Sequence, residues 1–469
     1  MIHFVLDGHT FVNEVQTIIQ VFYPNQKYKQ AEAPGEGLTV VSRLCGSACR
    51  GAVYRDGELL AAAESPWRER ADVKRPLYRV LRQLTGFDPP WGMLTGIRPA
   101  KKMTELLESQ TPEACLARFT EDFDVKPEKA ELALSVAQTE REVLARYGAD
   151  GVSLYIGIPF CPTRCLYCSF PSYPLEKFGG QVEGYLAALE QELVYFSHLL
   201  AGQPLRTIYI GGGTPTALSE KQLDGLLGRI AKLFPVEGLL EYTVEAGRPD
   251  TITAEKLEVL KAHGVSRISI NPQTMNDRTL VTIGRRHTVA DVERAYGLAR
   301  AAGHQNINMD LILGLPGEGV AEAAHTLERM RELAPESLTV HTLAIKRASR
   351  LNEQLEDYPL PSPADMEQML RLSRETAAAL GMRPYYMYRQ KYMNGNLENV
   401  GYARPGTECM YNIDMMEETV SILAHGAGAM TKRVYGGENR VERLPNPKDV
   451  PTYFAKLPRL FEGKQALFE

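Results

Sequence analysis

Three cysteines, Cys161, Cys165 and Cys168, stand close together in the segment 155–170. Their spacing, C-x3-C-x2-C, places three thiolates on one tight loop. A structural zinc ion usually takes four ligands, and no fourth Cys or His lies nearby in the sequence. A cubane iron–sulfur cluster has four irons, so three cysteines leave one iron open. An open iron that a substrate can chelate favours chemistry over plain electron transfer, and a chance group of buried free thiols is the alternative.

A glycine-rich segment, Gly211–Thr216, follows the predicted strand Arg206–Ile210. Glycines at such a turn let backbone amides approach a ligand closely, where a larger residue would block the approach. Taken alone, the segment is also compatible with an ordinary strand–helix turn. Because it follows the cysteine motif within an alternating series of strands and helices, it favours a ligand-binding loop.

The elements that must position these residues lie between Ser153 and Leu343, where apolar runs alternate with amphipathic helical stretches. The predicted strands are Ser153–Ile158, Arg206–Ile210, Leu240–Glu245, Arg267–Asn271, Asn306–Leu313 and Ser337–Leu343. The predicted helices are Gly180–Leu200, Ser219–Phe234 (with Ser219 as its N-cap), Thr253–His263, Val289–Ala302 and Glu318–Leu333. Six successive βα-like units predict a parallel sheet with outer helices. Such sheets carry their chemistry at the carboxyl ends of strands, where the cysteine loop, the glycine-rich loop, Glu245 and Asp310 all fall.

The segments on either side of this array do not continue its pattern, so three domains are predicted: 1–150, 151–345 and 346–469. The fold class is α/β, with a partial (β/α)6 TIM-like barrel, an N-terminal α+β domain with a helical connector, and a C-terminal α/β extension that covers the substrate. In the first domain we expect a strand and helix in Met1–Ile19, strands across Leu38–Ala63, helices Arg68–Leu84 and Pro127–Tyr147, and an ordered loop over 89–99. In the last we expect a helix from Pro363 to Leu380, strands and loops to about Tyr435, and helical segments from Glu438.

The composition is that of an ordinary protein of 469 residues with a net charge of −5. No polybasic tract indicates nucleic-acid binding, and no signal peptide or bilayer-spanning apolar stretch is evident. The remaining cysteines are scattered, as is usual in the cytosol, and Cys45 with Cys49 is a weaker candidate metal pair. We therefore expect a cytoplasmic protein without nucleic-acid or membrane partners, and we predict no oligomeric state.

The cysteine motif, with an aromatic residue before its third cysteine, resembles that of the radical S-adenosylmethionine (SAM) superfamily. The chain resembles the oxygen-independent coproporphyrinogen III oxidases, also called dehydrogenases, and most of all their HemZ-type branch. The resemblance rests on five segments that appear in the same order as in that family: Tyr155–Phe170, Gly211–Thr216, Glu245-Ala246, Asn271–His287 and Asp310–Gly317. The resemblance covers roughly residues 150 to 435. Heme chaperones and heme-degrading methyltransferases share the same core and stay open as alternatives.

The resemblance implies a [4Fe-4S] cluster held by the three cysteines and one molecule of SAM, or two. It implies cofactor contacts by Tyr155, Tyr167, Gly212, Gly213, Thr214, Glu245, Gln273, Arg285 and Asp310. Tyr155 and Arg285 are the candidate catalytic residues. The implied activity is oxidative decarboxylation of two propionates of coproporphyrinogen III to vinyl groups in heme biosynthesis, giving protoporphyrinogen IX. The implied partners are a tetrapyrrole substrate and a reductant such as flavodoxin or ferredoxin.

Two positions depart from the better-described branch, which has His in place of Gly157 and a fourth Cys in place of Phe170. These departures leave the reaction and a second SAM open. The segments 399–409 and 425–429 resemble family segments that cover the barrel mouth, and their glycines fit either a close macrocycle or packing turns. The cationic candidates for pairing with substrate carboxylates are Lys346, Arg347, Arg350, Arg389 and Lys391.

Overall fold

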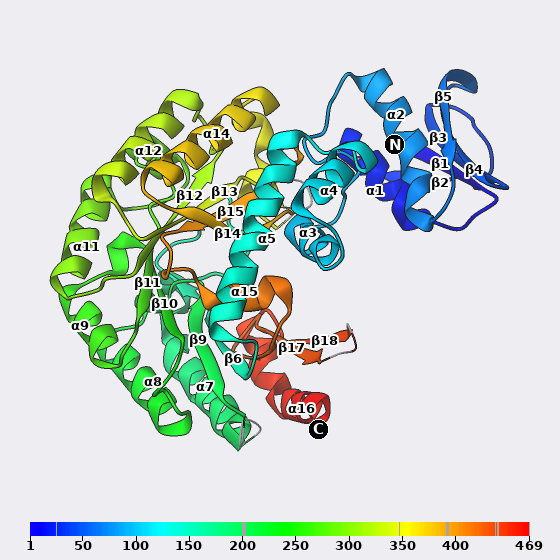
Figure 1. Cartoon of the computed structure of the whole chain (residues 1–469). Coiled ribbons are helices and arrows are strands. Elements are labelled where there is room, and N and C mark those ends of the chain that lie inside the picture. Colours follow the sequence, from blue (N-terminus) through cyan, green and yellow to red (C-terminus); the bar gives the residue numbers. More distant parts are fainter. Residues whose placement is uncertain are drawn as a thin grey trace. The chain divides into compact units, whose positions relative to one another are not determined.

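The computed structural model describes residues 1–24, 26–198, 203–346, 348–390, 394–436, 438 and 440–468. The chain forms two compact units (Figure 1). The N-terminal unit contains Met1–Leu134 and Arg389–Glu398, and the barrel unit contains Ser135–Tyr388 and Asn399–Glu469. Helix α5 (Pro127–Tyr147) begins in the first unit and ends in the second. No pattern in the sequence indicates that Arg389–Glu398 belongs with the N-terminal unit.

The N-terminal unit is built on a five-stranded sheet of order β2-β1-β3-β4-β5. Strand β1 pairs in parallel with β2 and β3, and β3, β4 and β5 pair antiparallel. Its elements are β1 (Ile2–Asp7), α1 (Val12–Phe22), β2 (Tyr28–Gln30), β3 (Leu38–Cys45), β4 (Ala48–Arg55), β5 (Glu58–Pro66), α2 (Lys74–Thr85), α3 (Pro99–Leu107) and α4 (Pro112–Ala117). The strand, helix and strands predicted before residue 66 are confirmed, whereas α3 and α4 were not predicted.

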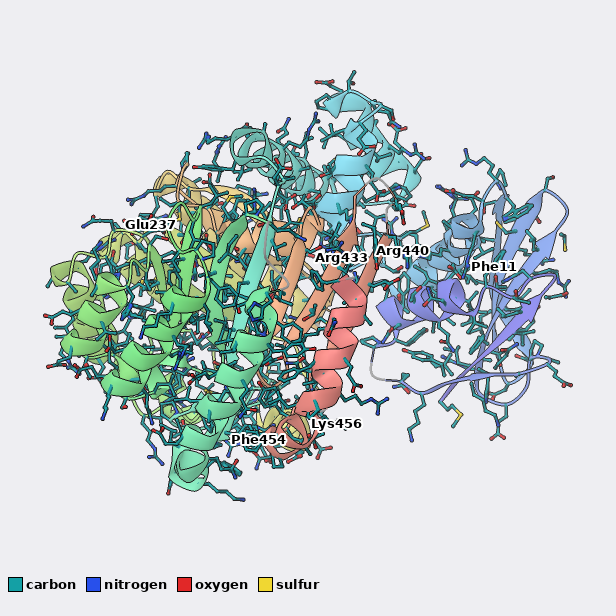
Figure 2. All side chains as sticks on the ribbon, turned by 90° about the horizontal axis from the view of Figure 1, so that it is seen from below. Phe11, Glu237, Arg433, Arg440, Phe454 and Lys456 are labelled. Atoms are coloured by element: carbon teal, nitrogen blue, oxygen red, sulfur yellow. The ribbon has the colours of Figure 1, made fainter. Side chains whose placement is uncertain are left out.

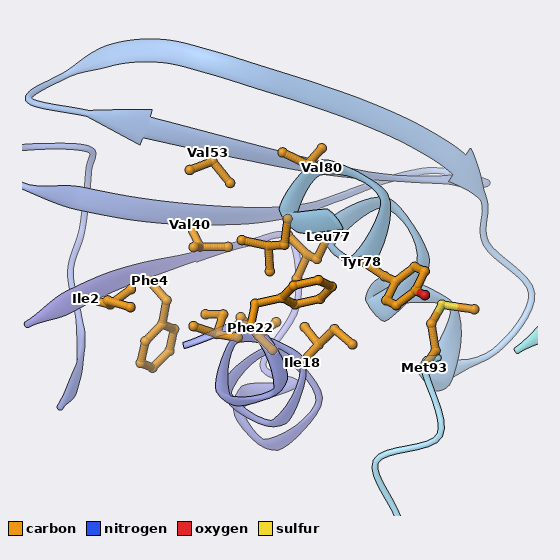
Figure 3. Packing of buried hydrophobic residues seen from close by; sticks show 13 residues of the cluster. Ile2, Phe4, Ile18, Phe22, Val40, Val53, Leu77, Tyr78, Val80 and Met93 are labelled. Atoms are coloured by element: carbon orange, nitrogen blue, oxygen red, sulfur yellow. The ribbon is translucent and has the colours of Figure 1, made fainter. Parts of the chain in front are cut away.

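Helices α1 and α2 cover one face of this sheet and form a single core with it (Figure 3). Phe4 of β1, Ile18 and Phe22 of α1, and Leu77 and Tyr78 of α2 are buried together. Burying a large apolar side chain stabilises a fold by roughly 1.5–3 kcal/mol. This unit therefore has a hydrophobic core of its own.

The segment Arg389–Glu398 is held in the N-terminal unit by its two end residues. The Arg389 guanidinium lies 5.6 Å from the centre of the Trp91 ring and donates to Asn396 Oδ1 at 2.5 Å. Glu398 accepts from Trp91 Nε1 at 2.8 Å and from Lys129 Nζ at 2.5 Å. Arg389 is thus buried and committed to structural contacts, which does not support its interpretation as a substrate contact. Two further cationic candidates, Arg347 and Lys391, lie outside the described residues.

The barrel unit contains an eleven-stranded sheet of order β14-β15-β13-β12-β11-β10-β9-β6-β16-β17-β18. Six adjacent parallel strands form its centre: β6 (Val152–Ile158), β9 (Leu205–Gly212), β10 (Glu241–Gly247), β11 (Arg267–Ile270), β12 (Ile307–Leu313) and β13 (Ser337–Thr342). The helices between them are α7 (Val182–Ser197), α8 (Glu220–Leu233), α9 (Ala254–Ala262), α10 (Asp277–Thr282) and α11 (Val289–Ala301), and α12 (Val320–Leu333) precedes β13. Figure 1 shows α7, α8, α9, α11 and α12 along the outer face of these strands. The α/β fold class with six parallel strands and outer helices is confirmed, although the predicted end of the first helix at Leu200 lies outside the described residues.

The C-terminal part extends this sheet at both edges. After α14 (Pro363–Ala379), strands β14 (Arg383–Tyr388) and β15 (Asn399–Ala403) add antiparallel to β13. After α15 (Met410–Glu417), strand β16 (Ser421–His425) pairs in parallel with β6 and is followed by β17 (Met430–Tyr435), β18 (Arg440–Pro445) and α16 (Val450–Phe468). Figure 2 labels Arg433 on β17, Arg440 on β18, and Phe454 and Lys456 on α16. The helical prediction from Glu438 is therefore wrong over β18, because this segment completes a hairpin with β17, and right over α16.

The loops after the first and the last of the six parallel strands are tied to each other. Leu351 N donates to Leu166 O at 3.0 Å, just after the cysteines Cys161 and Cys165. Arg350 donates to Arg164 O at 2.6 Å, and Arg164 in turn donates to the backbone carbonyl of Ala348 at 2.7 Å. These bonds fix the cysteine loop against the segment that follows β13. Loops from opposite ends of the strand array therefore meet at the carboxyl edge of the sheet.

A fully buried carboxylate, Glu192 of α7, joins the C-terminal helix to the barrel. It accepts hydrogen bonds from Lys464 Nζ at 2.5 Å, Tyr453 OH at 2.6 Å and the backbone N–H of Gly426 at 2.8 Å. Burial raises the pKa of Glu192, but the Lys464 ammonium and His425 outweigh burial and hold it below its ordinary value. The carboxylate is therefore ionised and pins α7, α16 and the loop after β16 together.

We expect Lys464→Met to destabilise the barrel unit by about 3–5 kcal/mol, because it leaves a buried charge without its partner. The matched control is Lys456→Met on the exposed side of the same helix (Figure 2), for which a change within about 0.5 kcal/mol is expected. Because the folded-state pKa of Glu192 is lowered, its contribution should be present above the ordinary carboxyl pKa and disappear as the pH falls. Urea denaturation at several pH values measures both effects, and equal midpoints for the two variants would contradict this role.

Candidate functional site

The cysteine loop leaves the carboxyl end of β6 and is packed against the glycine-rich loop after β9. Cys161 and Cys165 are buried, Cys168 is half-buried, and Cys168 N donates to Cys165 O at 3.2 Å. A Cβ placed on Gly213 would lie 3.0 Å from Cys161 Sγ and 2.7 Å from a backbone carbonyl oxygen. Only glycine therefore lets these two loops approach so closely. Thr214 Oγ1 also lies 3.5 Å from Cys161 Sγ, which brings the predicted SAM loop next to a predicted cluster ligand.

An arginine that the sequence analysis missed, Arg248, lies beside the cysteines. Its Nη1 is 4.0 Å from Cys165 Sγ and donates to Thr163 Oγ1 at 2.6 Å. Asp250 holds the guanidinium in place with two hydrogen bonds, of 2.9 and 2.6 Å. The signal in the sequence was Arg-Pro-Asp, which begins three positions after the end of the predicted strand Leu240–Glu245, at the edge where the other site residues lie.

The three thiols suit ligation by more than one iron. Burial raises the pKa of Cys168 to about 11, with a further contribution from Cys165, so metal coordination is what would keep this group as a thiolate at neutral pH. Among the described residues, no three His, Cys, Asp or Glu side chains are gathered as they would be around one metal ion. Thiolates need compensating positive charge, which Arg248 supplies near Cys165. The donor set and its surroundings fit an iron–sulfur cluster held by Cys161, Cys165 and Cys168.

The carboxylate of Glu245, in β10, faces the glycine-rich loop. Its Oε1 accepts from Tyr209 OH at 2.7 Å, and a Cβ on Gly211 would lie 2.8 Å from the same oxygen. Burial raises the pKa of Glu245 to about 7, against the bond from Tyr209 and with a further increase from the Asp310 charge. Glu245 therefore lies beside the predicted SAM loop. A positive charge added nearby would lower its pKa and keep the side chain ionised as a carboxylate.

Gln273 and Arg285 are both buried and keep unused polar atoms. Gln273 has a φ of 69°, a strained conformation for a residue with a side chain, and its Oε1 has no hydrogen-bond partner in the described structure. Arg285 donates to Asn271 O at 2.5 Å and to Tyr167 OH at 3.3 Å, while its Nε is left without a partner there. Buried polar atoms without partners are costly unless a ligand satisfies them. The predicted pair therefore fits a polar cofactor.

Asp310 of β12 is part of a polar group that the sequence did not reveal. It accepts from Asn308 Nδ2 at 2.7 Å, and His341 Nε2 of β13 lies 3.9 Å from its other oxygen. Tyr388 OH of β14 is 3.4 Å from His341 Nδ1. The Asp310 charge also raises the pKa of Glu245, which brings these strand ends into one site. His341 and Tyr388 carried no motif, and only the order of the strands in the sheet brings them together.

Tyr155 lies in a stack of three tyrosines inside the barrel unit. Its ring centre is 6.1 Å from Tyr209 and 5.9 Å from Tyr411, and those two rings are 4.6 Å apart. Burial raises the pKa of Tyr155, so its hydroxyl is neutral and available for hydrogen bonding. Tyr411 comes from α15, within a region expected to contain strands and loops. The stack gives the inner face of β6 and β9 a rigid aromatic surface.

Two glycines after residue 400, Gly401 and Gly426, serve packing. A Cβ on Gly401 would overlap the Tyr386 ring at 1.9 Å, and a Cβ on Gly426 would lie 2.5 Å from Gly157 O. Gly157 itself faces the loop after β16, since a Cβ there would lie 3.4 Å from Ala427 O. The packing interpretation therefore accounts for Gly401 and Gly426. The departure at Gly157 leaves the first parallel strand in close contact with this loop.

Comparisons with known proteins agree with this geometry. Residues 155–330 match the model of the radical SAM superfamily. The oxygen-independent coproporphyrinogen-III oxidase-like protein HemZ of Bacillus subtilis (strain 168) is 43% identical over 380 residues, which is 80% of this chain and 76% of the relative. The chain belongs to the family of HemZ-like radical SAM proteins. Members of the superfamily use a [4Fe-4S] cluster and SAM, which confirms the two predicted cofactors.

Other relatives divide between an oxidase and chaperones. The heme chaperone HemW of Bacillus subtilis (strain 168) is 35% identical and covers 59% of this chain and 70% of its own length. The oxygen-independent coproporphyrinogen III oxidase of Escherichia coli (strain K12) is 32% identical over 52% of each chain. The solved structure of coproporphyrinogen III oxidase (HemN) from Escherichia coli matches with a TM-score of 0.53 at 24% identity, over 69% of this chain and 73% of that one, and shows the shared fold. The chain is thus a HemZ-like radical SAM protein of a heme-related family.

Among the described residues, no helix is both long and apolar enough to cross a bilayer.

Proposed function

We propose that this protein is a radical SAM coproporphyrinogen III dehydrogenase, which oxidatively decarboxylates two propionates to vinyl groups. The observation that carries the proposal is the complete set of polar groups around the cysteine loop. Arg285 donates to Tyr167 OH of that loop, Gln273 N donates to Asp310 O, and the Asp310 charge raises the pKa of Glu245. Gln273 and Arg285 also keep buried polar atoms unused. A protein that only carried heme would not need to maintain such a costly arrangement.

The proposed roles follow from these positions. When bound, the cluster and SAM would supply a 5′-deoxyadenosyl radical able to take a hydrogen atom from the propionate carbon next to the ring, and loss of carbon dioxide and of one electron to an acceptor would then leave the vinyl group. Cys161, Cys165 and Cys168 hold the cluster, and the open backbone of Gly212 and Gly213 with Thr214 lines the SAM loop. Glu245 accepts hydrogen bonds from the amino group of SAM, and Gln273, Arg285 and Asp310 are assigned to a second SAM. Tyr155, in its stack, and Tyr167, beside Arg285, shield the site from water, so that radical and substrate meet in a fixed orientation.

A heme chaperone is the second candidate, and two specific observations favour it. HemW relatives share the core at up to 35% identity. At position 157 the better-described enzymes have a histidine, whereas this chain has a glycine that packs against the loop after β16. A methyltransferase that opens heme is a third candidate function for the same fold. A second SAM and a flavodoxin or ferredoxin as reductant stay predictions.

The decisive experiment is an anaerobic incubation with SAM, a reductant and coproporphyrinogen III, followed by mass spectrometry. We expect loss of two carbon dioxide molecules per substrate, with 5′-deoxyadenosine rising in step. Arg285→Ala should reduce this coupled turnover by about tenfold or more, the effect of losing one charged contact. The neighbouring Arg286→Ala, at an exposed position, is the matched control and should leave turnover unchanged. Stable heme binding without any decarboxylated product would instead identify a chaperone.

A further inference from the structure

Phe170 is an exposed aromatic residue directly after the cysteine loop. It follows Cys168 by two positions, and 63% of its surface is open to solvent. An exposed large apolar side chain beside a reactive centre is informative when polar or charged groups surround it in an ordered way. The backbone at Phe170 is held in position, because the next residue, Pro171, packs closely against Gly428. A Cβ added to Gly428 would lie 3.0 Å from Pro171 Cγ. The ring is therefore presented from a fixed loop.

One lysine, Lys346, lies against this ring, and a second, Lys448, lies on a neighbouring segment of the fold. Lys346, just after β13, places its ammonium 5.6 Å from the centre of the Phe170 ring. Lys448 follows Pro447, whose carbonyl accepts from Gly428 N at 2.8 Å on the other side of the loop. Burial lowers the pKa of Lys346, the charge of Cys168 opposes this effect, and the charge of Lys448 lowers the pKa further.

Neither ammonium group is paired with a carboxylate among the residues that the structure describes. Two like charges that lie close to each other are unfavourable on their own, and an anionic ligand would relieve their repulsion. Arg164 on the cysteine loop and Arg350 after β13 differ from the lysines, because each donates to a backbone carbonyl. Lys346 and Lys448 are thus two described cations that a ligand could use at this edge.

We propose that Phe170, Lys346 and Lys448 form a binding platform for a flat tetracarboxylate macrocycle, with the macrocycle packed on the Phe170 ring and its carboxylates paired with the two lysines. This rests on the proposed function and names the part of the protein that receives the substrate. An aromatic ring suits the apolar face of a macrocycle, and ammonium groups at its border suit carboxylates on the rim. The segments after β6, β13 and β18 supply the platform, and the carboxyl ends of these strands lie on the edge where the cysteines lie.

The test is equilibrium binding of coproporphyrin III, the stable and fluorescent oxidised form of the substrate, to the anaerobic holoprotein. We expect Phe170→Leu to weaken binding about threefold to tenfold and Phe170→Tyr to restore it, since a ring is retained. Lys346→Gln should weaken binding about fivefold and reduce its dependence on salt, because one charge pair is lost. Lys232→Gln, at an exposed position on α8, is the matched control and should bind normally. Coproporphyrin tetramethyl ester, which lacks the carboxylates, should bind the unaltered protein weakly and show no effect of Lys346→Gln.

Iron content is measured for every variant, so that loss of the cluster is not mistaken for loss of the platform. Binding that Lys346→Gln and Phe170→Leu leave unchanged would overturn the proposal. So would a slower reduction of the cluster by a reduced flavodoxin, with porphyrin binding intact, because the surface would then serve the electron donor. Competition of SAM alone for the platform would assign it to the cofactor instead. If the variants lose porphyrin binding but the unaltered protein never decarboxylates, the platform stands and the proposed reaction fails.

Discussion

Cys165→Ala is expected to lose the iron–sulfur cluster and with it every radical reaction of the protein. The unaltered chain, reconstituted without oxygen, should hold about four irons at this site, and the variant should hold close to none. The reason is geometric, since Cys165 lies at the centre of the loop and is the cysteine closest to the Arg248 guanidinium. Iron and sulfide analysis with electron paramagnetic resonance of the reduced protein measures this loss.

Cys45→Ala provides the matched control for that experiment. Cys45 is exposed at the end of β3 in the N-terminal unit, and it lies outside the cysteine motif. This variant should retain the full iron content and the spectrum of the unaltered protein. Zinc in place of iron in protein purified without oxygen, or four irons retained by Cys165→Ala, would refute the assignment of the cluster.

The parallel core was predictable because its strands and helices carry their own local signals. Runs such as Ser153–Ile158 and Asn306–Leu313 carry apolar residues at alternate positions and are buried along almost all of their length, and they fall within one or two residues of β6 and β12. Ser219 caps α8 as expected, with its hydroxyl accepting from Gln222 N at 3.3 Å. Where local chemistry and the global fold agree, the sequence is a reliable guide.

The parts that could not be predicted depend on contacts between distant segments. Nothing near Arg389 in the sequence reveals that it will lie over Trp91, almost 300 positions earlier. Strand β18 is polar and short, and its pairing with β17 decides its conformation more than its own propensity does. In the site, the cysteines and Glu245 were found because motifs mark them. His341 and Tyr411 were missed because the sheet order and α15 bring them to the site, and no spacing rule encodes that.

Glu245→Gln is the second substitution with a large expected effect. The change keeps the size of the side chain and an acceptor for Tyr209 OH but removes the negative charge. We expect the cluster absorbance to be unchanged and reductive cleavage of SAM to fall by about tenfold to a hundredfold, as for the loss of one charge-assisted hydrogen bond of about 1.5–3 kcal/mol. The measurement is 5′-deoxyadenosine formation in the anaerobic holoprotein. Glu255→Gln, on the exposed face of α9, is the matched control and should cleave SAM normally.

The pH dependence of SAM binding gives a sharper test of the same residue. Burial raises the pKa of Glu245 to about 7, Asp310 raises it further, and Tyr209 and Arg267 oppose them. Below that pH the side chain is largely protonated and cannot pair with an ammonium group, so SAM affinity should increase as the pH rises from about 6 to about 7. The comparison ends near pH 7.5, because an α-amino group loses its own proton at about 7.7–8.0. In Glu245→Gln the increase should vanish. An identical pH profile in the variant and the unaltered protein would show that Glu245 does not bind the amino group of SAM.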